Sequence, residues 1–178
     1  MLVLAITASF ASCNSSNEDY WTEYAEWRDA NNAWIEAQAA LKTADGKDFY
    51  TKIVPTWNSQ AYVLMHYYND TMLTKDNLKP LSSSTCDVKY HGKLYNDVAF
   101  DSSYLSTAPA DSVYRSYLPN MVAGWSIALQ KMHIGDSCQI IIPYSYGYGD
   151  RSMGTIKPYS HLVFNIKLVD IPGYEKKP

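Results

Sequence analysis

The sequence predicts an α+β fold, in which an antiparallel sheet wraps a short helix and follows an N-terminal helical extension. Three observations support it. A stretch without Gly or Pro comes first, short alternating or apolar segments follow, and one short helical segment interrupts those segments. Helices and strands therefore do not alternate as a parallel sheet requires. No internal repeat or second sheet domain is visible in the sequence.

Composition limits the function classes. A chain of 178 residues fits one ordinary domain with an appendage and can bury a real core. The net charge of −3 and the lack of a long basic run predict no nucleic-acid partner. The 16 tyrosines exceed what a core needs, so they indicate an aromatic-lined surface.

The first 19 residues are typical of a processing signal and a tether. The stretch "MLVLAITASFASC" is apolar, ends in small residues and is too short to span a bilayer. Its last four residues resemble a bacterial lipoprotein box, in which Cys13 becomes the lipidated residue. An ordinary signal peptide with an incidental Cys13 is the alternative. Either way, the folded part is expected outside the cytoplasm, and lipidation would hold it on a bacterial membrane, on the periplasmic side or at the cell surface.

Residues 20–59 are expected to form a separable helical extension before a domain of residues 60–178. Residues 20–43 are rich in Ala, Glu and Gln, and the Asp45-Gly46 pair marks the end of this helix. Aromatic and apolar residues recur along it every seven positions, with Tyr24 between them. The stripe either packs on its own domain or dimerises the protein, so a monomer and a helix-mediated dimer both remain open. Its members are Tyr20, Trp27, Trp34 and Leu41; Asn31 and Gln38 interrupt it, which makes it a poor coiled coil.

The remaining elements follow in order. Strands are predicted at residues 60–70, 88–94, 136–143 and 161–171, and the last alternates most clearly. Directly before the third predicted strand, residues 122–135 predict a turn followed by a short helix, which ends at Gly135. The four histidines are scattered, and no Cys/His spacing suits a metal, so neither a metal nor a cofactor is expected.

Three segments together resemble the FKBP-type peptidyl-prolyl cis-trans isomerases. They are "VKYHGKLYNDVAFDSSY" (88–104), "VAGWSIALQKMHIGDSCQIIIPYSYGYGD" (122–150) and "IKPYSHLVFNIKLVDI" (156–171). The family pattern is VxYxG…FDSS, then GW…L…M..G, then IP…YG, then P…LVF. No single piece is specific, but four pieces in register are. The resemblance covers roughly Gln60 to Ile171.

The resemblance implies an apolar pocket that holds a proline ring. Trp125 would form its floor, Asp101 a polar group at its rim, and the Tyr148 hydroxyl a donor to a substrate carbonyl; these three are the expected catalytic residues. The expected substrate-binding residues are Tyr90, Phe100, Val122 (through its backbone N–H), Ile156 and Phe164. The family's second phenylalanine wall has no clear match, and Val113 or Tyr114 could take its place.

The implied function is prolyl isomerisation that assists the folding of exported proteins, with proline-containing polypeptides as partners. Two alternatives stay open: a binding module or chaperone with the same pocket but little turnover, and a structural surface lipoprotein. The family's strand order would also place the C-terminal strand between the strands of Cys86 and Cys138. Because that separation is about 10 Å, and a disulfide needs Cα atoms within about 7 Å, we predict that the two cysteines do not pair.

Overall fold

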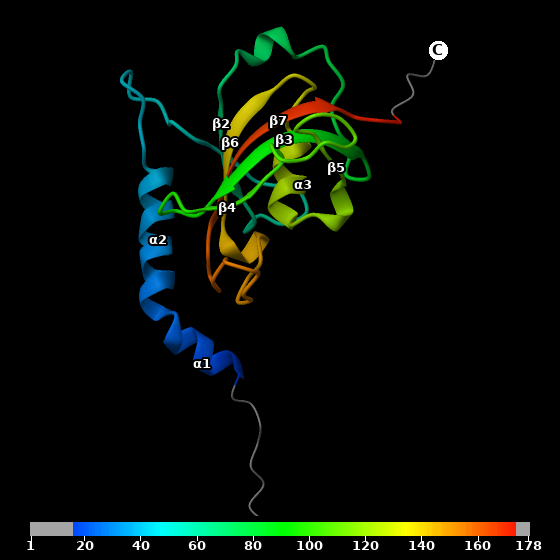
Figure 1. Ribbon diagram of the computed structural model, residues 1–178. Coiled ribbons are helices and arrows are strands. Elements are labelled where there is room, and N and C mark those ends of the chain that lie inside the picture. The colour runs from blue at the N-terminus through cyan, green and yellow to red at the C-terminus, as the bar shows by residue number, and fades with distance from the viewer. Residues whose placement is uncertain (1–15, 174–178) are drawn as a thin grey trace, which may run out of the picture.

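The computed structural model describes residues 16–173 (Figure 1). The predicted signal, Cys13 and residues 14 and 15 of the tether lie outside these residues. Residues 16–19, which were predicted to belong to the flexible tether, instead begin a helix. No helix within the described part of the chain is long and apolar enough to cross a membrane.

The N-terminal extension consists of two helices, α1 (Ser16–Glu23) and α2 (Ala25–Ala39). The prediction of one unbroken helix over residues 20–43 was therefore wrong at both ends and at Tyr24, where the helix breaks. The break leaves the Trp21 carbonyl without a helical partner, and the Arg28 guanidinium donates to that oxygen over 2.8 Å. After Ala39 the chain forms a short turn with Gly46 at φ 81°.

The sheet has seven antiparallel strands, which confirms the predicted fold class. Six follow the order β1-β2-β6-β7-β3-β4, and β5 pairs with β3. One prediction needs correction: β1 lies within residues 20–59, so the sheet begins before residue 60. The strands are β1 (Thr51–Ile53), β2 (Val63–Tyr67), β3 (Thr85–Lys93), β4 (Ala99–Ser102), β5 (Tyr114–Tyr117), β6 (Ser137–Ile142) and β7 (Leu162–Asp170).

The two faces of the sheet bury different side chains, because successive residues of a strand point to opposite faces. One face packs on α3 (Ala123–Leu129) and forms the larger core, to which β7 contributes Leu162, Phe164, Ile166 and Leu168. Short 3-10 turns (Thr71–Leu73, Leu118–Asn120 and Tyr144–Tyr146) connect the elements around this core.

The opposite face is covered by α2, which lies on the other side of the sheet from α3 (Figure 1). Ile35 of this helix packs with Leu64, Ile141 and Val163, one residue from each of three neighbouring strands. Trp27 and Trp34 of the aromatic stripe contact the ring of Tyr95 at centroid distances of 5.1 and 6.2 Å. The helix therefore packs on its own domain rather than standing apart from it.

Cys86 on β3 and Cys138 on β6 are both buried and free. Strand β7 lies between their strands, as the family's strand order implied. The prediction that these cysteines do not pair is confirmed.

Candidate functional site

A cavity of about 240 Å³ opens between α3 and the face of the sheet that forms the larger core. Seven of the eight predicted site residues line it, although they come from β3, β4, β7, α3 and the loop after β6. Three further lining residues are Tyr114, Asn120 and Met121. The complete lining is Tyr90, Phe100, Asp101, Tyr114, Asn120, Met121, Val122, Trp125, Tyr148 and Phe164.

Aromatic rings form the base and walls of this cavity. Trp125 on α3 is 1% exposed. Its indole meets the rings of Tyr90 and Phe164 edge-on, at centroid distances of 5.1 and 5.2 Å. Phe100 on β4 continues the wall, with its ring 5.5 Å from that of Phe164 and nearly perpendicular to it. Edge-to-face contacts of this kind stabilise aromatic pairs beyond the area they bury, so the walls are well fixed.

Gly92 on β3 allows the two phenylalanine walls to meet. A Cβ atom at this position would lie 2.8 Å from ring atoms of both Phe100 and Phe164. Such a distance is shorter than ordinary van der Waals contact, so any side chain here would displace the rings. The glycine in "VKYHG" is thus explained by the packing of the cavity wall rather than by backbone conformation.

The polar groups of the cavity are arranged around Asp101. The Tyr90 hydroxyl donates to Oδ2 of Asp101 over 2.7 Å, and the Ser102 backbone N–H donates to Oδ1 over 2.8 Å. Burial raises the pKa of Tyr90, and its bond to the Asp101 carboxylate raises it further. Burial likewise raises the pKa of Tyr148, with a contribution from the Asp101 charge. Both hydroxyls therefore stay protonated near neutral pH and can donate hydrogen bonds.

Two sequence predictions are refined by the geometry. Tyr114, rather than Val113, lines the cavity at the position left open for the second wall; its ring lies 5.7 Å from that of Tyr90. Val113 is buried elsewhere, at 4% exposure. Ile156 was expected in the pocket, but it is buried in the core that supports the cavity and does not line it.

Asn120 and Met121 were missed by the sequence reasoning. They end the 3-10 turn that leads into α3 and directly precede Val122, which caps that helix. Their position next to Val122 was the only available signal.

The indole N–H of Trp125 is buried and has no acceptor among the described residues.

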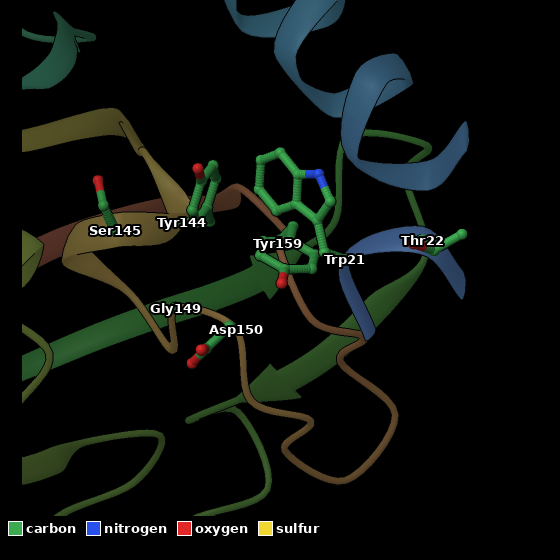
Figure 2. A pocket seen from close by; sticks show the side chains of 7 residues that line it. All are labelled: Trp21, Thr22, Tyr144, Ser145, Gly149, Asp150 and Tyr159. Atoms are coloured by element: carbon green, nitrogen blue, oxygen red, sulfur yellow. The ribbon is translucent and has the colours of Figure 1, made fainter. Parts of the chain in front are cut away.

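A larger cavity of about 730 Å³ lies where α1 meets the loop after β6 (Figure 2). Figure 2 shows the Trp21 indole beside the Tyr159 ring, and their centroids are 5.5 Å apart. Gly149 and Asp150 line this cavity, whereas their neighbour Tyr148 lines the smaller one. The same short loop thus borders both. Among residues 16–173, no group of three or more His, Cys, Asp or Glu residues is placed to hold a metal.

Comparisons with known proteins agree with this geometry. A family model described as "FKBP-type peptidyl-prolyl cis-trans isomerase" matches residues 77–169. FK506-binding protein 2 of Debaryomyces hansenii is 35% identical over 102 residues, which are 57% of this chain and 74% of that protein. Outer membrane protein MIP of Legionella longbeachae is 35% identical over 94 residues, 52% of this chain but only 39% of the relative.

A solved structure shows the same fold. The crystal structure of a peptidyl-prolyl cis-trans isomerase from Pseudomonas syringae pv. tomato matches with a TM-score of 0.64 and 24% identity. The match covers 83% of this chain and 95% of the other, so it extends beyond the sheet domain into the N-terminal part. Together with the matched family model, which spans more than half of the residues, these findings show that the chain belongs to the FKBP-type peptidyl-prolyl cis-trans isomerase family.

Proposed function

We propose that this protein catalyses cis-trans isomerisation of X–Pro bonds in exported polypeptides, and that it does so in the 240 Å³ aromatic cavity. The observation that carries the proposal is the lining of this cavity. Rings form its base and walls, and polar side chains, among them Asp101 and Tyr148, stand beside them. A small space walled by aromatic rings suits a proline ring.

The chemistry needs no nucleophile. Rotation about an X–Pro bond has a barrier of about 20 kcal/mol, because twisting the amide destroys its resonance. No bond to the substrate breaks. The twisted amide has a less polarised carbonyl than the planar one, so it loses less on transfer into a site without water. A dry aromatic cavity that also fixes the flanking carbonyls therefore binds the transition state in preference to the ground state.

Each residue has a distinct part in this proposal. Trp125 supports the proline ring from below, while Tyr90, Phe100 and Phe164 enclose it. The backbone N–H of Val122 and the Tyr148 hydroxyl donate to substrate carbonyls on either side of the proline. The Asp101 carboxylate holds the Tyr90 hydroxyl and places negative charge at the rim, where the twisted amide is exposed.

The isomerase assay that tests this uses proline tetrapeptides and two variants that leave the apolar walls in place. Asp101→Ala and Tyr148→Phe each remove a polar contact worth on the order of 1–3 kcal/mol, so each should lower kcat/KM about fivefold to a hundredfold. Folded wild-type protein no faster than the uncatalysed reaction would reject the enzyme and favour a binding module. Equal activity in wild type and both variants would instead mean that the pocket is assigned to the wrong residues.

We propose further that the protein works outside the cytoplasm, attached to a membrane by a lipid on Cys13. The lipoprotein-like "FASC" segment supports this, as does the relative whose name places it in the outer membrane. Metabolic labelling with a fatty-acid analogue should mark the wild-type protein and not Cys13→Ser. Equal labelling of both would reject lipidation at Cys13.

A further inference from the structure

The N-terminal helix α2 reaches the loop that carries Tyr148 through one buried amide side chain. Asn31 is fully buried, at 0% exposure. Its Oδ1 accepts the backbone N–H of His161 over 3.0 Å, and its Nδ2 donates to the Trp27 carbonyl over 2.8 Å. Both ends of the amide are therefore satisfied. A buried polar group is costly unless it is paired in this way, and docking of the helix alone could be achieved by an apolar residue.

The ring of His161 connects Asn31 to Tyr144. His161 is 2% exposed, and its Nδ1 accepts the backbone N–H of Tyr144 over 2.9 Å. The rings of Tyr144 and His161 also stack, at a centroid distance of 5.6 Å and an angle of 28°. Tyr144 is therefore held to the strand end of β7 by its backbone and by its side chain together.

The Tyr144 backbone in turn holds both neighbours of Tyr148 in the chain. The Tyr144 carbonyl accepts the N–H of Gly147 over 3.0 Å and the N–H of Gly149 over 2.9 Å. The Gly149 carbonyl in turn accepts the N–H of Tyr159 over 2.9 Å. Because Tyr148 stands between these two glycines, their hydrogen bonds fix the backbone from which its side chain enters the cavity.

We propose that Asn31 is a positioning residue for the isomerase reaction, which places the Tyr148 hydroxyl through His161 and Tyr144. This inference rests on the proposed function, because Tyr148 matters only if it binds substrate there. The N-terminal extension is then part of the catalytic apparatus rather than a spacer between the domain and the membrane. Loss of the amide frees the Tyr144 backbone to shift, and a shift of about 1 Å at a reacting group can lower a rate up to about a hundredfold.

The kinetic test is a double-mutant cycle on the full chain. Asn31→Ala should lower kcat/KM about tenfold. Tyr148→Phe should then have a much smaller effect in the Asn31→Ala background than in wild type, because the hydroxyl is already misplaced. Ile35→Ala is the matched control, since Ile35 is also buried on the same helix and the hydrophobic cluster to which it belongs contains none of these residues. Additive effects of Asn31→Ala and Tyr148→Phe, or equal coupling for Ile35→Ala, would overturn the proposal.

Hydrogen exchange provides a second test that does not depend on activity or on a folded variant. In wild type, the amides of His161, Gly147 and Gly149 and the side-chain amide of Asn31 should open with the same free energy, as one cooperative unit. Glycine amides that open much more readily than His161 would overturn the connection. If wild type shows no isomerase activity, the proposed function fails, while the exchange data still decide whether helix and loop are joined.

Discussion

Protonation of His161 should weaken the folded protein in a defined pH range. Burial lowers the pKa of His161 to about 4, compared with 6.5 for an ordinary histidine. Its Nδ1 accepts a hydrogen bond from the Tyr144 N–H, so the proton of the neutral ring is on Nε2, which is buried without an acceptor in the described structure. A second proton would have to go to Nδ1 and would replace the bond to Tyr144 by a repulsive contact.

The magnitude follows from the difference between the two pKa values. One pH unit of displacement corresponds to about 1.4 kcal/mol, so the displacement of His161 corresponds to about 3 kcal/mol. Between pH 6.5 and about 4, the unfolded chain binds more protons at this residue than the folded protein does. The contribution of neutral His161 to the free energy of unfolding should therefore be fully present above pH 6.5. It should be lost as the pH decreases through this window.

Urea unfolding followed by tryptophan fluorescence, at intervals from pH 7.5 to 4, measures this effect. Carboxylates also begin to titrate at the acid end, so the informative quantity is the difference between wild type and His161→Asn. This variant keeps a hydrogen-bond acceptor near the Tyr144 N–H but cannot titrate. Wild type should lose about 3 kcal/mol more than His161→Asn across the range. Parallel pH curves for the two proteins would refute the reasoning, whatever their stabilities at pH 7.

Three further predictions concern the cavity and the buried thiols. Gly92→Ala should lower kcat/KM and cost about 1–3 kcal/mol of stability, because its methyl group displaces both phenylalanine walls; unchanged kinetics would show that the walls are soft. Trp125→Ala should cost about 3–5 kcal/mol in chemical denaturation and abolish activity, and a stable, inactive variant would show that its role is not structural. Cys86 and Cys138 should resist alkylation at pH 8 in the folded protein, since burial raises the pKa of Cys86 to about 12 and also raises that of Cys138. Both should titrate as free thiols after unfolding without reductant, and absence of either would contradict the free state.

Alternation of apolar residues predicted four of the seven strands, β2, β3, β6 and β7, and it places residues such as Phe164 well. Phe100 lies in the short strand β4, where no alternation is visible, so only the family resemblance placed it in the cavity. The choice between Val113 and Tyr114 could not be made in this way, because β5 begins at Tyr114 and Val113 lies just before it. The lining of the cavity, which includes Tyr114 and not Val113, settles it.

Other features depend on contacts that are distant in the sequence. Strand β1 is only three residues long and has no alternating pattern, so nothing local separates it from a loop. In the sequence Asn31 interrupts an apolar stripe, yet it is the most buried polar residue of α2. Its partner, His161, is 130 residues away. A polar residue within an apolar helix face can therefore either interrupt the packing or form a buried hydrogen bond. Only its tertiary partner distinguishes the two cases.

The face of the sheet under α2 has a practical meaning for the production of shortened proteins. Leu64, Ile141 and Val163 stand in register on β2, β6 and β7 and form a continuous aliphatic row. A recombinant protein that starts at residue 60 would lack Ile35 and also β1, so this row would face water beside an unpaired strand edge. Poor solubility of such a fragment would be a property of the truncation and would say nothing against the stability of the isomerase fold.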